Sequence, residues 1–67
     1  MGKNLKLKAA RAALGLTQQE LGERVGVTRQ TILAIERGDY NPTIKLCRAI
    51  CRVLDRTLDD LFWEDGE

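Results

Sequence analysis

The sequence contains no histidine, a single proline, two cysteines and only three aromatic residues among its 67 residues. Histidine is the usual catalytic base near neutral pH and a frequent metal ligand, so its absence argues against an enzyme and against a metal or cofactor site. No apolar run reaches the ~18 residues of a membrane-spanning helix, and no charged-then-apolar leader opens the chain. We therefore expect one cytoplasmic domain without membrane contact or an evident small-molecule ligand.

The two cysteines, Cys47 and Cys51, lie four residues apart on one face of a predicted helix. Side chains at this spacing do not meet in the geometry of a disulfide bond, whereas cysteine packs well as a small apolar residue. We interpret both as buried core residues. A redox or metal-binding pair is the less favoured alternative.

Threonine and glycine mark the boundaries of five predicted helices, and no strictly alternating apolar and polar run indicates a strand. Threonine is a preferred N-cap because its hydroxyl accepts a hydrogen bond from a free amide of the first turn, and glycine commonly ends a helix. We expect helices over about 5–14, 18–25, 29–37, 44–54 and 58–61, with caps at Thr17, Thr28, Thr43 and Thr57. The chain is therefore predicted to be all-α.

Apolar residues recur at helical spacing within these segments. The first segment carries Leu7, Ala10 and Leu14, and Asn4 is its candidate cap, although Lys3–Lys6 could instead be extended. The fourth segment has a broad apolar side that is expected to be buried. It comprises Leu46, Cys47, Ile50, Cys51, Val53 and Leu54.

The formal net charge is only +1, but the charge is unevenly distributed. Residues 1–38 carry seven basic and three acidic side chains, and residues 39–67 carry four basic and seven acidic ones. Charged residues at both ends could simply keep the protein in solution. Because the basic half contains the motif described next, we interpret it as a surface that attracts nucleic acid.

Residues 17–37 combine two short helices with a tight turn between them. Thr17 and Glu20 have the spacing of a capping box at the start of the first of these helices. Gly26 permits the positive φ of the turn, and Gly22 lies where the two helices approach most closely. Two short helices joined by about three residues cross at a steep angle, which predicts a helix-turn-helix.

The second helix of this motif divides into two faces. Thr31, Ile32, Ile35 and Glu36 face the body of the protein, and the outward set is Arg29, Gln30, Leu33, Ala34 and Arg37. Arginine can bind guanine O6 and N7 with two hydrogen bonds, and glutamine can do the same with adenine N6 and N7. Free amides at a helix N-terminus favour phosphate, and Gln18 and Gln19 stand at such a position. The pattern therefore predicts a protein that reads the major groove of double-stranded DNA.

The run from Leu16 to Gly38 resembles the helix-turn-helix of the XRE family, the phage Cro and repressor type. Asn41-Pro42-Thr43 and Leu58-Asp-Asp-Leu-Phe62 are similar to later signatures of that family. The resemblance implies a phage-repressor-like fold of five helices in a single domain of residues 1–67. It further implies a transcriptional regulator of the prokaryotic cytosol or nucleoid, or one encoded by a phage.

The resemblance also assigns roles to individual residues. It implies base readout by Thr28, Arg29, Gln30, Leu33 and Ala34. It implies a phosphate contact by Gln18 and suggests further ones by Arg37, Tyr40 and Asn41, and the position of Gln19 in the first turn of its helix adds that residue to the expected phosphate contacts. Arg11 and Glu36 match a structural salt bridge. The sequence departs from the family at Gly22, where alanine is usual, and at Ala34, where many members have a longer polar side chain.

The C-terminal residues are candidates for a subunit interface. One short reading helix contacts few base pairs, whereas two copies about 34 Å apart read a palindrome, so we expect a homodimeric repressor. The segment of about 57–65 would pair, through Leu58, Leu61, Phe62 and Trp63. Folding of Phe62 and Trp63 onto the core of their own chain is the alternative, and related proteins add a short β-strand at the chain ends. An antitoxin that binds DNA and a protein-interaction adaptor are the alternative functions.

Overall fold

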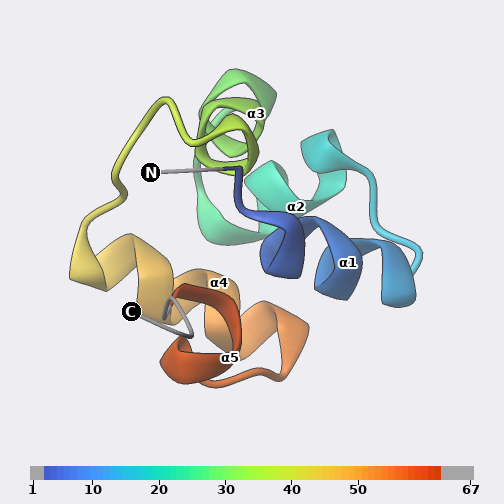
Figure 1. The fold of residues 1–67 in the computed structure, drawn as a ribbon. Coiled ribbons are helices and arrows are strands. Elements are labelled where there is room, and N and C mark those ends of the chain that lie inside the picture. Colours follow the sequence, from blue (N-terminus) through green and yellow to red (C-terminus); the bar gives the residue numbers. More distant parts are fainter. Residues whose placement is uncertain (1–2, 63–67) are drawn as a thin grey trace.

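The computed structural model describes residues 3–62, which form five α-helices and no strand (Figure 1). The helices are α1 (Leu5–Ala13), α2 (Gln18–Val25), α3 (Arg29–Arg37), α4 (Ile44–Leu54) and α5 (Leu58–Phe62). The predicted all-α fold of five helices is therefore confirmed. Residues 3 and 4 precede α1 without strand structure, and the rest of the suggested terminal strand falls outside the described residues.

The predicted helix starts are confirmed because each cap is a local hydrogen bond. Thr17 Oγ1 accepts from the amide of Glu20 at 3.0 Å, and Glu20 Oε1 accepts from the amide of Thr17 at 2.8 Å, which completes a capping box. The hydroxyls of Thr28, Thr43 and Thr57 accept from the amide three residues on at 3.1–3.3 Å. Asn4 Oδ1 caps α1 by accepting from the amide of Leu7 at 3.0 Å.

The turns after α2 and α4 have the same left-handed conformation with different residues. Gly26 has φ 82° after α2, and Asp55 has φ 56° after α4. In both turns the next amide donates to the carbonyl five residues back, from Val27 to Gly22 and from Arg56 to Cys51. These bonds satisfy carbonyl groups that the helix end would otherwise leave unpaired.

One core joins all five helices. Its largest fully buried side chains are Leu7, Leu21, Ile32, Ile50 and Leu54. Cys47 and Cys51 are both buried and are not joined by a disulfide bond, as the apolar interpretation predicts. Leu14 departs from the helical pattern: it is 53% exposed, because α1 ends at Ala13 and the chain turns outward at the next residue.

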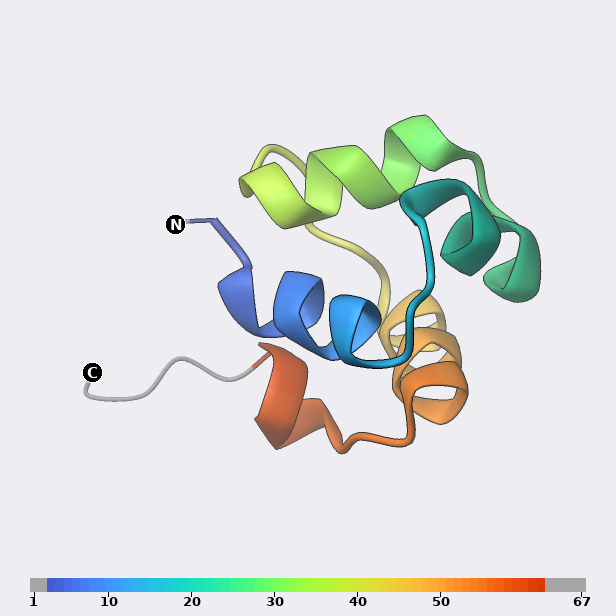
Figure 2. The same cartoon turned by 90° about the vertical axis from the view of Figure 1, so that its right-hand side faces the viewer.

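The helix pairs place α3 at the edge of the molecule. α2 packs against α3 and α4, and α1 packs against α5 and α3. Figure 2 shows α3 along one side, with α4 and α5 at the opposite side and α1 between them. One face of α3 therefore stays accessible along its length. Within residues 3–62, no helix has the length and apolar character needed to cross a bilayer.

Candidate nucleic-acid interface

The turn between α2 and α3 depends on close backbone contact at Gly22. A Cβ atom at this position would lie 2.7 Å from the carbonyl oxygen of Val27 and 3.2 Å from that of Thr28. Both are backbone atoms, so they cannot move aside without shifting the start of α3. Gly22 therefore lies at a close approach of α2 to the start of α3, as its place in the sequence indicates, and the absence of a side chain allows this approach.

The outer face of α3 carries the long polar side chains. Arg29, Gln30 and Arg37 are exposed, and Leu33 and Ala34 are half-buried beside them. Neither the Arg29 nor the Gln30 side chain has a hydrogen-bond partner within residues 3–62, so both side chains can meet a ligand without breaking an internal bond.

Thr28 is exposed, but its hydroxyl is already hydrogen-bonded within the protein. It accepts from the amide of Thr31 at 3.3 Å and lies 3.2 Å from the hydroxyl of Thr31. Its first role is therefore to cap the N-terminus of α3. Any contact that it makes to a base would compete with this cap or use the methyl group.

The inner face of α3 is buried, and its buried polar side-chain atoms are all hydrogen-bonded. Ile32 and Ile35 pack into the core, and Glu36 is 7% exposed. Arg11 Nε donates to Glu36 Oε2 at 2.7 Å and Arg11 Nη2 donates to Glu36 Oε1 at 3.3 Å. Arg11 Nη1 also donates to the carbonyl of Leu16 at 2.8 Å. This ion pair, which the resemblance implied, fastens α1 and the α1–α2 turn to the back of α3.

Glu36 has two further partners that sequence reasoning missed. Gln18 Nε2 donates to Glu36 Oε1 at 3.1 Å, and the backbone amide of Asn4 donates to the Glu36 carbonyl at 2.8 Å. These residues are separated from Glu36 by 18 and 32 positions, and no local spacing connects them. Glu36 thus ties three other segments of the chain to the last turn of α3.

The residues expected to contact phosphates fall into two groups. Gln18 and Gln19 stand at the start of α2; the first is half-buried and held by Glu36, and the second donates weakly to Glu23 at 3.4 Å. Tyr40 and Asn41 are exposed on the loop that follows α3. Because Glu36 occupies only one N–H of Gln18, the other can still donate to an anion.

The expected subunit contacts require one correction. Leu61 is 2% exposed and lies in the core of its own chain, because α5 packs against α1 and α4. Leu58 and Phe62 are half-buried and pack on the same core, and Trp63 lies outside the described residues. Large apolar side chains that are exposed are found elsewhere, at Leu5, Leu14, Tyr40 and Ile44.

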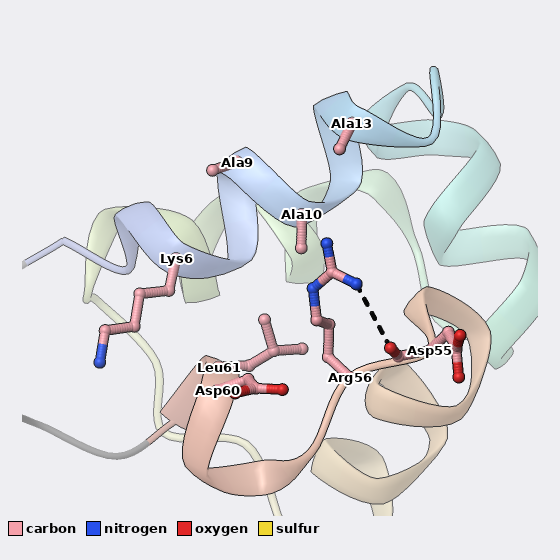
Figure 3. Close-up of a pocket in the computed structure, with 8 residues that line it drawn as sticks. All are labelled: Lys6, Ala9, Ala10, Ala13, Asp55, Arg56, Asp60 and Leu61. Atoms are coloured by element: carbon pink, nitrogen blue, oxygen red, sulfur yellow. Dashed lines mark hydrogen bonds between the residues drawn. The ribbon is translucent and has the colours of Figure 1, made fainter.

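An open groove of about 670 Å³ runs between α1 and α5, on the side of their contact that faces away from α3 (Figure 3). It is lined by Lys6, Ala9, Ala10, Ala13, Asp55, Arg56, Asp60 and Leu61. Arg56 Nη1 donates to the carbonyl of Asp55 at 3.4 Å across its rim. In the part of the chain that the structure describes, no three thiol or carboxylate groups gather as metal ligands would.

Comparison with known proteins agrees with this geometry. Residues 7–61 match the model of the helix-turn-helix family. YgzD, an HTH-type transcriptional regulator of Bacillus subtilis strain 168, is 48% identical over 62 residues, which cover 92% of this chain and 94% of YgzD. An HTH-type transcriptional regulator of Methanothermobacter thermautotrophicus is 52% identical over 63 residues, with 90% of this chain and 91% of that protein covered.

A solved structure shares the arrangement of the helices. The crystal structure of the restriction-modification controller protein C.AhdI from Aeromonas hydrophila is similar with a TM-score of 0.82 and 29% sequence identity, and the match covers 88% of this chain and 89% of that one. The family model spans most of the chain, and the relatives match over nearly their whole length. The chain therefore belongs to the helix-turn-helix family of DNA-binding transcriptional regulators, of the XRE type.

Proposed function

We propose that the protein is a homodimeric repressor that binds a palindromic operator in double-stranded DNA and reads it with α3. The observation that carries the proposal is the contrast on α3. Arg29 and Gln30 are exposed and unengaged at its N-terminal end, while its inner face is fixed by buried contacts. A rigid helix that presents free arginine and glutamine side chains has the properties required for hydrogen bonding to base edges.

The two side chains have separate roles in this proposal. Arg29 binds the O6 and N7 atoms of a guanine, and Gln30 binds the N6 and N7 atoms of an adenine. Leu33 and Ala34, half-buried one turn further along α3, contact thymine methyl groups. Thr28 assists through its methyl group, because its hydroxyl caps α3.

Phosphate contacts orient the helix without reading sequence. In the proposal these come from the second N–H of Gln18, from Gln19 at the start of α2, and from Arg37, Tyr40 and Asn41 at the C-terminal end of α3 and in the loop after it. The exposure of the last three supports this arrangement. Together with the base contacts near the N-terminal end of α3, these phosphate contacts would hold the helix in the groove in one orientation.

Two copies are proposed because α3 is short. Its nine residues span about 13 Å, so one helix contacts only a few base pairs. Two helices about 34 Å apart would read both halves of a palindrome on one side of the duplex. We assign the contact between subunits to Leu58, Phe62 and Trp63, and Leu61 supports α5 from beneath instead of joining the interface.

Selection from a random pool of DNA duplexes tests the proposal. The expected result is an enriched palindrome with half-sites about one helical turn apart. Arg29→Ala should then lower the affinity for that duplex on the order of tenfold or more and relax the preference at one base pair in each half-site.

Arg48→Ala is the matched control, because Arg48 is an exposed arginine on α4, at the opposite side of the molecule from α3. It should retain both the affinity and the base preference. Failure to enrich any sequence would refute sequence-specific binding. An enriched site without symmetry would refute the paired reading.

A further inference from the structure

We propose that Lys3 is an additional contact to the DNA backbone, held beside the C-terminal end of α3. This inference rests on the proposed function, since it extends the surface that binds DNA. The sequence offered no reason to separate Lys3 from the other lysines of the first segment. The structure separates it, because of where the chain is fixed just after it.

Asn4 is fixed by two hydrogen bonds of different kinds. Its amide donates to the carbonyl of Glu36 at 2.8 Å, and its side chain caps α1 at the amide of Leu7. The Cα atom of Lys3 is one peptide unit away, about 3.8 Å from that of Asn4. The backbone of Lys3 is therefore held against the last turn of α3, although 33 residues of sequence separate it from Glu36. Figure 2 shows the short segment that leads into α1, from residue 3, beside this end of α3.

The charge of Lys3 is available at this position. Lys3 is exposed and has no ion-pair partner within residues 3–62. Glu36, the acidic residue beneath it, is neutralised by Arg11 at 2.7 Å. Arg37 ends α3 and Asp39 follows two residues later, both exposed, and their formal charges cancel. The end of α3 thus has a net positive side chain to offer to a phosphate.

The other lysines of the segment are placed differently. Lys6 lines the groove between α1 and α5 together with Asp60, on the side away from α3 (Figure 3). Lys8 is exposed but lies on the second turn of α1, beyond the residue that Glu36 holds. Only Lys3 lies next to the bond between the start of the chain and α3.

The dimensions of the DNA major groove bring the C-terminal end of α3 close to the phosphate backbone of the DNA. The helix is about 13 Å long and the major groove is about 12 Å wide. When Arg29 and Gln30 reach base edges from the N-terminal end, groups just past the other end lie close to a phosphate strand. Lys3 would then act together with Arg37, and it would add affinity without base preference.

The test compares Lys3→Ala with Lys45→Ala on the duplex selected for the parent protein. Lys45 is an exposed lysine near the start of α4, an element that lies away from α3 in Figure 1. Affinity is measured by fluorescence anisotropy at several salt concentrations. Loss of one phosphate contact should reduce the slope of log affinity against log salt by about 0.9 for each bound protomer.

The expected result is a shallower slope and weaker binding at low salt for Lys3→Ala, with base preference unchanged, and parental values for Lys45→Ala. Lys3→Arg should retain the parental slope. An unchanged slope for Lys3→Ala, or an equal loss for Lys45→Ala, would overturn the assignment while leaving the proposed function intact. Failure of the parent itself to bind any duplex would instead overturn both. Thermal unfolding of each variant, followed by circular dichroism, verifies that the proteins compared are folded.

Discussion

The two faces of α3 differ in burial and in the hydrogen bonding of their side chains. On the inner face Ile32 and Ile35 are buried and every buried polar side-chain atom has a partner. On the outer face Arg29 and Gln30 are exposed and have no partner within residues 3–62. The nine residues of α3 therefore divide between stability and binding. Substitutions on the inner face should therefore change folding, and those on the outer face should change binding alone.

The largest effect is expected from Glu36→Ala on the inner face. This change leaves the Arg11 side chain, which is 13% exposed, without its carboxylate partner, and it also removes the acceptor of the Gln18 side-chain amide. Loss of one partner of a buried ion pair costs about 3 kcal/mol or more, because the remaining charge stays buried. That is a large part of the stability of any small domain. Urea unfolding followed by circular dichroism measures the change.

Two control variants show whether the loss of stability is specific to Glu36. Glu23→Ala removes an exposed glutamate of α2 and should alter stability by less than about 0.5 kcal/mol. Arg29→Ala, on the outer face, should have as small an effect on unfolding while it weakens DNA binding. If Glu36→Ala unfolded at the same urea concentration as Glu23→Ala, the inner face would not provide the stability that its contacts indicate.

A smaller effect is expected from Gly22→Ala. This substitution lies on α2 beside the start of α3 and replaces no residue on either face of α3. Alanine inside a helix gains about 1 kcal/mol over glycine from propensity. Here the new Cβ would meet the Val27 carbonyl at 2.7 Å, and forcing extra volume into a packed site costs about 1–3 kcal/mol. We therefore expect a net loss on the order of 1 kcal/mol by urea unfolding, and weaker DNA binding because the start of α3 must shift.

The reverse change at an exposed site calibrates this prediction. Ala12 is exposed on α1, so Ala12→Gly measures the propensity difference in the same protein. If Gly22→Ala stabilised the protein by as much as Ala12→Gly destabilises it, α2 and α3 would have room for a methyl group, and the close contact would not constrain the turn.

Local hydrogen bonds explain how much of this molecule could be predicted from its sequence. The threonine caps and the capping box join residues three positions apart, so their spacing alone predicts them, and with them the helix boundaries and the two faces of α3. The contacts of Gln18 and Asn4 with Glu36 join distant segments, and they depend on how the helices pack. Leu61 shows the same limit: periodicity identifies it as apolar, but only the position of α5 decides whether its own core or a partner covers it.

The smallest effect concerns the capping box that starts α2, and it appears as a dependence on pH. Hydrogen bonds from the backbone and side chain of Thr17 hold the pKa of the Glu20 carboxyl below its usual value of 4.5. A carboxyl whose pKa is lowered by folding contributes stability that is fully present above its unfolded pKa. This contribution is lost as the pH falls through the folded pKa.

Glu20→Gln retains a side chain that can accept from the Thr17 amide but does not titrate. The parent should therefore be slightly more stable than Glu20→Gln at about pH 7, and the two unfolding curves should converge as the solution is acidified to about pH 3. The other carboxyls are common to both proteins, Asp60 included, so their contributions cancel in the difference. Urea unfolding at a series of pH values measures it. Parallel curves over this range would show that the Glu20 carboxylate does not support the start of α2. The capping box would then depend on the Thr17 hydroxyl alone.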